Sequence, residues 1–229
     1  MDHRSTDRSG RRTFSEYFRV TPFVVFGAGG FARELLGWIA NCGLAKRERF
    51  AVAAWISESN DVGSTVHGIP VIAADDWTDP PPRYVISVSN PDQKKRIALA
   101  MAERGWQPEI FIHDGAAVGL SPKIGAGTII CPSCRISTDA TIGDHVLVNS
   151  GSGVGHDAVV GSYSSLLGAV SVNGNVTVGE GVLLGAGSMI YPGKQVGDGA
   201  KIGLGSVVLR NVPAGATMFG NPAARIDVR

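Results

Sequence analysis

The sequence is poor in cysteine, balanced in charge and free of long apolar runs, and each shortage excludes a class of protein. Three cysteines in 229 residues are an odd number and too few for a disulfide framework, so we expect a reducing, cytoplasmic setting. A formal net charge of +1 gives no basic or acidic surface for nucleic acid or an anionic membrane. No apolar run approaches the ~20 residues that cross a bilayer, so we expect no membrane span.

Glycine, by contrast, is abundant, and most of the 31 glycines follow residue 114. In the same region an aliphatic residue occupies every sixth position without a break. The series is Val118, Ile124, Ile130, Ile136, Ile142, Val148, Val154, Val160, Leu166, Val172, Val178, Leu184, Ile190, Val196, Ile202 and Val208. The fourth residue after each aliphatic is mostly small, as at Thr128, Cys134 and Ala140. A large and a small side chain at two fixed points of each hexad are typical of the inward positions of a hexapeptide-repeat β-helix.

The repeat also predicts the dimensions of this solenoid. Three hexads form one triangular coil, so the sixteen hexads predict a little over five coils, stacked at the strand spacing of about 4.8 Å. Glycine or asparagine often follows the aliphatic residue, as at Gly125, Gly143 and Asn149. We interpret these residues as corners that adopt a positive φ angle.

The repeat explains most polar residues of this region as structural. Cys131 and Cys134 form a C-x-x-C pattern, but Cys134 occupies a small inward position and no second cysteine pair exists. Both are therefore predicted to be small core residues rather than zinc ligands. His145 falls at an outward position and is predicted to be solvated. With His156 it makes two histidines in the repeats, fewer than a shared three-histidine zinc site needs, so no metal is expected.

One polar pair, in the stretch VGHDAVVG at residues 154–161, has a different character. His156 follows Gly155 at a corner and is predicted to project outward. Asp157 can accept a hydrogen bond from one imidazole nitrogen and fix the tautomer, which leaves the other nitrogen as a proton acceptor. Taken alone, the residues fit a surface histidine with an unrelated acidic neighbour equally well.

The segment before the solenoid has another composition. Residues 1–21 are polar and rich in arginine and are expected to form a disordered leader. Strands are predicted at PFVVF, FAVAAWIS and RYVISVS, and helices from about Phe31 and at PDQKKRIALAMAERG. The turn GAGGFA at residues 27–32 joins the first strand to the first helix, where glycine and a helix N-terminus favour a phosphate. Three strands and two helices make half of a dinucleotide fold, which predicts a site for part of a nucleotide.

The motifs, taken in order, resemble those of one family. FGAGGFARE, VHGIPVI, IFIHDGAAVG, VNSGSGVGHDAVVG and GNPAARI follow one another between about residues 22 and 226. This series is similar to that of the hexapeptide-repeat sugar O-acyltransferases and nucleotide-amino-sugar N-acetyltransferases, which include the sialic acid, bacillosamine-pathway and perosamine acetyltransferases. The resemblance implies a Rossmann-like, nucleotide-sugar-binding α/β module at residues 22–109. It also implies a left-handed parallel β-helix acetyltransferase domain at residues 110–229.

The resemblance further implies a reaction and its residues. The expected enzyme is a homotrimer with active sites between neighbouring solenoids, and it transfers acetyl from acetyl-CoA directly to the amino group of a nucleotide-linked amino sugar in surface glycan synthesis. His156 would be the general base and Asp157 its orienting acid. The implied acetyl-CoA contacts are Ser165, Gly174, Ala186 and Leu204. The implied substrate contacts are Gly29, Gly30, Phe31, Ser57, Glu58, Ser89 and Asn149.

Three positions depart from the family pattern. Many relatives have histidine at the position of Ser165, and paired acidic residues often stand where this chain has Ser57 and Glu58. The turn after the third strand usually reads Gly-Asp or Gly-Asn, whereas here it reads Ser89-Asn90. The last two changes fall in the expected nucleotide pocket and leave the base, uridine or guanosine, open.

Other functions compete with this interpretation. A sugar O-acetyltransferase of the sialic acid type would use the same base on a hydroxyl acceptor, although the glycine turn favours a nucleotide-linked one. An NAD-dependent oxidoreductase rests on that turn alone and conflicts with the short α/β module. A non-catalytic structural solenoid would show a flat, repetitive, threonine-rich face, which these coils lack.

Overall fold

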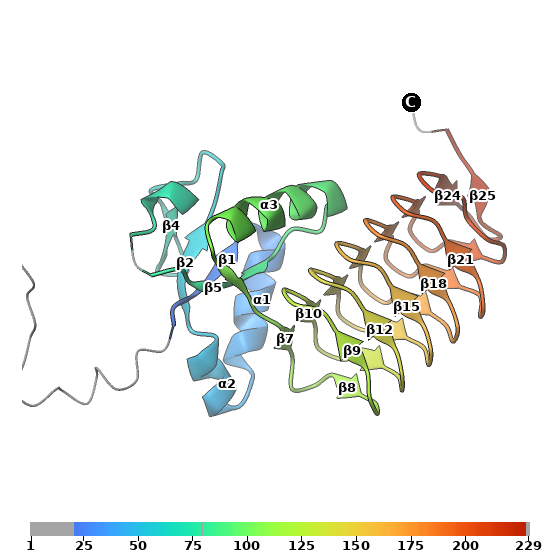
Figure 1. The fold of residues 1–229 in the computed structure, drawn as a ribbon, viewed down its shortest axis with the longest axis horizontal. Helices are drawn as coiled ribbons and strands as arrows, with labels where there is room; N and C mark the ends of the chain where they lie inside the picture. Colours follow the sequence, from blue (N-terminus) through green and yellow to red (C-terminus); the bar gives the residue numbers. More distant parts are fainter. Residues whose placement is uncertain (1–20, 79, 228–229) are drawn as a thin grey trace, which may run out of the picture.

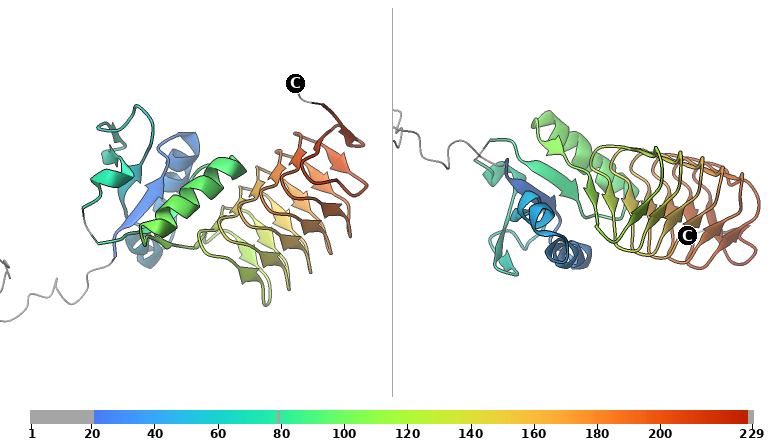
Figure 2. Two further views of the ribbon diagram at one scale, coloured as in Figure 1. Left: turned by 45° about the horizontal axis from the view of Figure 1, so that its top comes forward. Right: turned by 90° about the horizontal axis from the view of Figure 1, so that it is seen from below.

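The computed structural model describes residues 21–78 and 80–227, which form an α/β module followed by a β-solenoid (Figure 1). Apart from its last residue, the leader predicted at residues 1–21 lies outside the described residues. Every helix in the described ranges is too short or too polar to cross a membrane. Two further views show the module at one end of the solenoid, beside its first coils (Figure 2).

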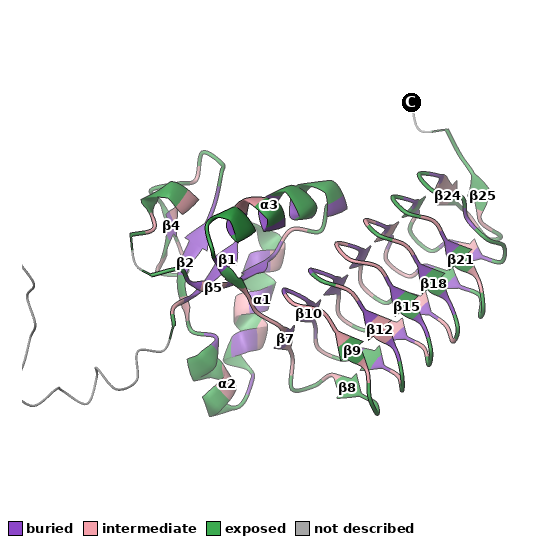
Figure 3. Ribbon diagram, viewed as in Figure 1, coloured by how far each residue is buried: buried purple, intermediate pink, exposed green. Residues whose placement is uncertain are grey.

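The module contains the three strands and two helices that the sequence predicts. Strand β1 (Phe23–Phe26) lies between β2 (Val52–Ile56) and β5 (Arg83–Ile86) and pairs with both in parallel. Alternate residues of β1 point to opposite faces, so Phe23 and Val25 share a core with helix α1 (Gly30–Ala40). Val24 and Phe26 share a second core with helix α3 (Pro91–Glu103). The strand is therefore buried on both faces, as a parallel strand between helices must be (Figure 3).

The module also has smaller elements that the sequence analysis did not predict. The additional elements are α2 (Leu44–Arg49), β3 (Thr65–Val66), β4 (Ile69–Ile72), the 3-10 helix η2 (Ala74–Asp76) and β6 (Gln107–Pro108). The sheet order is β3-β4-β2-β1-β5-β6, with β3 and β4 pairing antiparallel at one edge. At the other edge, β6 pairs with β5, and the chain then enters the solenoid.

The solenoid is the predicted left-handed parallel β-helix, built from strands of two residues, or three in β24, in three sheets. Residues eighteen apart pair in register, as Ile129 does with Leu147, so one coil is three hexads. Sheet 1 contains β7 (Phe111–Ile112), β10 (Ile129–Ile130), β13 (Leu147–Val148), β16 (Ser165–Leu166), β19 (Leu183–Leu184), β22 (Lys201–Ile202), β24 (Thr217–Phe219) and β25 (Ala224–Arg225). Sheet 2 contains β8 (Ala117–Val118), β11 (Arg135–Ile136), β14 (Gly153–Val154), β17 (Ser171–Val172), β20 (Met189–Ile190) and β23 (Val207–Val208). Sheet 3 contains β9 (Lys123–Ile124), β12 (Thr141–Ile142), β15 (Val159–Val160), β18 (Thr177–Val178) and β21 (Gln195–Val196).

The interior of the prism follows the hexad rule. From Ile130 to Val208 the aliphatic residues of the series are buried, and so are the small residues four positions later, Cys134 among them. Cys131 is buried as well, which confirms that both cysteines are core residues. The buried hydroxyls also link strands, because the Ser152 hydroxyl donates to the Leu167 carbonyl at 2.7 Å and accepts from the Val170 N–H at 3.1 Å. Inward hydroxyls such as that of Ser152 therefore complete backbone hydrogen bonds, whereas the buried Ser188 hydroxyl has no hydrogen-bond partner among the described residues.

The corner geometry corrects one prediction. Positive φ angles occur at the third residue after each aliphatic from Val118 to Ile202, and not at the residue that follows it directly. These positions are Ser121, Gly127, Ser133, Asp139, His145, Gly151, Asp157, Tyr163, Ala169, Asn175, Gly181, Gly187, Gly193, Gly199 and Gly205. The glycine directly after the aliphatic serves close stacking instead, since a Cβ at Gly161 or Gly185 would lie 2.5 to 2.7 Å from the backbone of the next coil.

The module packs on sheet 1 and the two corners beside it. Lys94 of α3 reaches sheet 1, where its Nζ donates to the Ser164 carbonyl at 3.1 Å and to the Ser165 hydroxyl at 2.7 Å. Burial without a carboxylate partner lowers the pKa of Lys94 to about 7. At the corner between sheets 1 and 2, the Asp114 carboxylate accepts from the Gly43 N–H at 2.8 Å and pairs with Lys46.

His145 lies in this interface, so the prediction that it is solvated is wrong. The residue is 7% exposed, and its ring is stacked between Tyr84 of β5, at 5.9 Å between centroids, and Tyr163 of the next coil, at 5.7 Å. Burial lowers the pKa of His145 to about 4, which keeps the ring neutral. The residue occupies an outward position of the hexad, as predicted, but the module covers it.

Candidate active site

His156 lies at the corner between β14 of sheet 2 and β15 of sheet 3. Position 155 of this corner requires a glycine, because a Cβ there would overlap the backbone of Gly174 in the next coil. Asp157 follows with a φ angle of 57°, a left-handed conformation that aspartate tolerates better than most residues. The imidazole is 63% exposed and the carboxylate 56% exposed, so the pair projects outward as the sequence predicts.

The two side chains are joined by a hydrogen bond. The Nδ1 atom of His156 lies 2.9 Å from Oδ2 of Asp157. A proton on Nδ1 is held by this carboxylate, which leaves Nε2 as a proton acceptor. Nε2 lies against the next coil, where a Cβ added to Gly174 would be 2.5 Å away. The arrangement can therefore take a proton from a nucleophile that approaches this corner.

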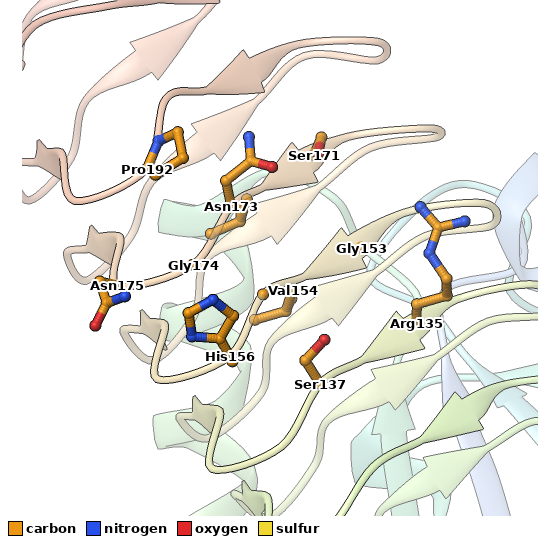
Figure 4. A pocket seen from close by; sticks show the side chains of 12 residues that line it. Arg135, Ser137, Gly153, Val154, His156, Ser171, Asn173, Gly174, Asn175 and Pro192 are labelled. Atoms are coloured by element: carbon orange, nitrogen blue, oxygen red, sulfur yellow. The ribbon is translucent and has the colours of Figure 1, made fainter.

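Two hollows adjoin His156. One has a volume of about 370 Å³, and its lining includes Ser171, Asn173, Gly174, Asn175 and Pro192 (Figure 4). The other has a volume of about 420 Å³ and extends toward β8. The side chains of Arg135, Ser137 and His156 line both hollows. The imidazole thus stands where two reactants can meet.

A third pocket, of about 420 Å³, lies in the module. Its wall contains every module residue that the sequence analysis assigned to substrate, namely Gly29, Gly30, Phe31, Ser57, Glu58 and Ser89. No side chain caps the N-terminus of α1, so the first backbone N–H groups of this helix point into an open pocket. Such a helix end favours a phosphate.

Two carboxylates also line the module pocket. Glu58 forms a two-pronged ion pair with Arg96 of α3, and this hydrogen bonding lowers the pKa of its carboxyl group. Asp61, which the sequence analysis missed, also lines the pocket and accepts a hydrogen bond from the Ser57 hydroxyl at 2.6 Å. The available signal was a second acidic residue within four positions of Ser57, in the loop after β2.

The residues assigned to acetyl-CoA are not gathered at one place in a single chain. Gly174 lies beside His156, whereas Ala186 and Leu204 lie at the corner between sheets 1 and 2, as does Asn149. Ser165 is fully buried beneath α3, where Lys94 donates to its hydroxyl. It has no surface that a ligand could contact, so its assignment to acetyl-CoA disagrees with this structure.

The module pocket and His156 also face different sides of the chain. The module contacts sheet 1, and the corner between sheets 2 and 3 is the edge of the prism opposite that sheet. One chain therefore does not bring the pocket and the imidazole together. Among the described residues, no group of three or more His, Cys, Asp or Glu side chains could hold a metal ion.

These features define a class of protein. A hexapeptide β-helix with an outward His–Asp pair beside open hollows, preceded by an α/β module with a phosphate-favouring turn, is the architecture of a hexapeptide-repeat acyltransferase.

Comparison with known proteins narrows the class. No family model matches the chain. The chain is 30% identical over 207 residues to the GDP-perosamine N-acetyltransferase of Escherichia coli O157:H7, which covers 87% of this chain and 93% of that protein. The chain therefore belongs to the hexapeptide-repeat sugar acetyltransferase family.

Solved structures share the whole fold. WeeI from Acinetobacter baumannii AYE superposes with a TM-score of 0.82 at 27% identity, over 90% of this chain and 99% of that one. PerB from Caulobacter crescentus, solved with CoA and GDP-perosamine, superposes with a TM-score of 0.79 at 26% identity, over 90% and 97% of the two chains.

Proposed function

We propose that the protein is an acetyl-CoA-dependent N-acetyltransferase that acts on the amino group of a nucleotide-linked amino sugar in surface glycan synthesis. The observation that carries this proposal is the His156–Asp157 pair, joined at 2.9 Å and open to two hollows at once. The similarity to a GDP-perosamine N-acetyltransferase, and to an enzyme solved with CoA and GDP-perosamine, supports both reactants.

The proposed reaction is direct transfer. The neutral amine attacks the thioester carbonyl of acetyl-CoA, and His156 Nε2 takes the proton that the nitrogen loses. Collapse of the tetrahedral intermediate breaks the carbon–sulfur bond, and the imidazolium returns the proton to the departing thiolate. Asp157 stabilises the imidazolium between these two steps. Backbone N–H groups near Gly174 would stabilise the developing oxyanion, and the Gly174 N–H itself makes no backbone hydrogen bond within the described ranges.

The working unit in this proposal is a homotrimer. Because His156 and the module pocket lie on different sides of one chain, a neighbouring chain has to supply the pocket that faces a given imidazole. The position of Asn149, Ala186 and Leu204 along a different corner supports the same arrangement. These residues would contact the reactants at a site formed with the solenoid of a neighbour, and Leu204 is 63% exposed.

The proposal is tested by incubating the protein with acetyl-CoA and GDP-, UDP- or dTDP-linked 4-amino sugars and following CoA release. We expect one nucleotide sugar to give an alkali-stable amide product. Thermal-shift measurements with the same ligands should show stabilisation by CoA and by that nucleotide sugar. An alkali-labile ester, with stabilisation by CoA but by no nucleotide, would instead identify a sugar O-acetyltransferase.

A further inference from the structure

An arginine on the outer face of sheet 2 stands beside His156 without an assigned role. Arg135 is the outward residue of β11, and its neighbour Ile136 points into the core. The residues in register with it on the flanking strands are Ala117 on one side and Gly153 on the other, with Ser171 one strand further. All three are small, so the guanidinium lies in a shallow trough.

The guanidinium is directed toward the coil that carries His156. A Cβ added to Gly153 would lie 3.6 Å from Nη2 of Arg135, so the arginine extends across this glycine (Figure 4). The absence of a side chain at Gly153 keeps that path open.

The charge of Arg135 is not compensated within the described part of the chain. Arg83 and Arg96 each have a carboxylate partner, but no ion pair or side-chain hydrogen bond involves Arg135. No aspartate or glutamate lines either hollow at His156. Because the guanidinium of arginine is a cation, the two hollows share a positive charge that favours an anionic ligand.

The position of Arg135 near His156 favours one of two possible anionic ligands, the diphosphate of the nucleotide sugar or the phosphates of CoA. Arg135 and His156 line the same two hollows, and the guanidinium lies beside Gly153, whose Cα is within about 10 Å of the His156 Cα because the two residues are three apart in the chain. A sugar ring places its amine and its diphosphate on opposite sides at a comparable distance. The pantetheine arm of CoA is much longer and would carry the CoA phosphates beyond this reach.

We propose that Arg135 binds the diphosphate of the nucleotide-linked sugar and so holds the sugar ring with its amine at His156. The inference rests on the proposed function and adds a substrate-binding residue on the solenoid, separate from the module pocket. A planar guanidinium can donate two parallel hydrogen bonds to phosphate oxygens. The sugar nucleotide would then be held by the module at its nucleoside and the adjoining phosphate, and by Arg135 of sheet 2 at the phosphate that carries the sugar.

The test compares the steady-state kinetics of Arg135→Met, Arg135→Lys and the wild type. Arg135→Met should raise the KM for the nucleotide sugar about 10- to 100-fold, the effect of losing a hydrogen bond to a charged group, with the KM for acetyl-CoA unchanged. Arg135→Lys keeps the positive charge but cannot donate two parallel hydrogen bonds. Its KM for the nucleotide sugar should therefore fall between the values of the wild type and Arg135→Met. With the free amino sugar, which has no diphosphate, the variant and wild-type kcat/KM values should coincide.

Lys123→Met is the matched control. Lys123 is the outward residue of β9 in sheet 3, exposed like Arg135 but lining neither hollow, so its loss should leave both KM values unchanged.

The outcomes separate this inference from the proposed function. If the wild type acetylates a nucleotide sugar and Arg135→Met has the same KM for it, the inference is wrong and the function stands. A raised KM for acetyl-CoA alone would assign Arg135 to the CoA phosphates and overturn the inference. A wild type that acetylates no nucleotide-linked amino sugar overturns the proposed function and this inference with it.

Discussion

His145 and His156 both sit in corner loops of the hexapeptide repeat and have opposite surroundings. His145 is stacked between two tyrosines under the α/β module, whereas His156 is 63% exposed and lies in two hollows. Both residues occupy outward positions, so the repeat does not distinguish them. The difference arises because the module covers the corner of His145 and leaves the corner of His156 open. We therefore expect His145 to contribute to stability and His156 to catalysis.

The largest effect is expected when His156 is removed. His156→Ala should lower kcat about 10²- to 10⁴-fold, because general-base catalysis contributes about that factor. The melting temperature should stay unchanged, because an exposed side chain leaves no cavity. Acetyl-transfer assays and thermal denaturation on the same preparation check both parts. A near-normal kcat of His156→Ala would show that His156 is not the general base.

The second-largest effect on turnover is expected at Gly174. A Cβ at this position would lie 2.5 Å from Nε2 of His156, so Gly174→Ala should displace the imidazole and lower kcat about 10-fold or more through lost positioning. Gly181→Ala is not a suitable control, because Gly181 has a positive φ angle. Gly37→Ala, in α1, is the matched control, because a Cβ there would meet nothing within 4 Å and the residue lines neither hollow at His156. A Gly174→Ala variant with wild-type kcat would contradict this contact.

His145 should show the reverse pattern, with its loss affecting stability more than turnover. His145→Ala removes two aromatic stacking contacts and should lower the free energy of unfolding by about 1–3 kcal/mol. His145→Phe keeps the stack and should restore most of this loss. Urea unfolding at pH 7 measures both variants, and an alanine variant as stable as the wild type would contradict the interface role.

The pH dependence of this stability follows from the pKa of His145. The folded-state pKa of about 4 lies below the ordinary value of 6.5, so the unfolded chain binds more protons between these values. The stabilisation is therefore complete above about pH 6.5 and is lost as the pH falls toward 4. His145→Phe should remove this part of the acid sensitivity.

A further effect is a change in the free energy of unfolding at alkaline pH that depends on Lys94. Its folded-state pKa of about 7 lies below the ordinary 10.5, so the unfolded chain binds more protons between these values. The stability that this residue contributes should rise from pH 7 to pH 9 and be lost as the pH returns to 7. Lys94→Met should flatten this slope relative to Lys95→Met, which removes an exposed lysine one position along α3. Equal slopes in the two variants would contradict the buried, unpaired state of Lys94.

The sequence predicted what depends on local periodicity. The unbroken aliphatic series from Val118 to Val208 determines which side chains enter the coil, because a two-residue strand and its corner repeat every six residues. The strand–turn–helix pattern around Gly29 likewise placed α1 correctly, since its glycines and apolar residues are close in the sequence.

The sequence could not predict what depends on how distant elements meet. The burial of His145 requires Tyr84, which is 61 residues away, and the burial of Ser165 requires Lys94 of α3. Glycine can serve either a positive φ angle or a close backbone contact, and the sequence does not distinguish these two purposes. Only the stacked coils show that Gly161 and Gly185 allow the backbone of the next coil to approach closely. Asp61 was missed because the loop after β2 has no repeat to mark it.

The most direct test of the central claim is complementation between two inactive variants. His156→Ala lacks the base, and Gly30→Glu places a carboxylate at the phosphate-favouring end of α1 in the module pocket. If His156 of one chain acts on a sugar held by the module of another, co-expressed chains should form mixed assemblies that regain acetyl-transfer activity. Mixed assemblies that stay as inactive as either variant alone would contradict a site shared between chains.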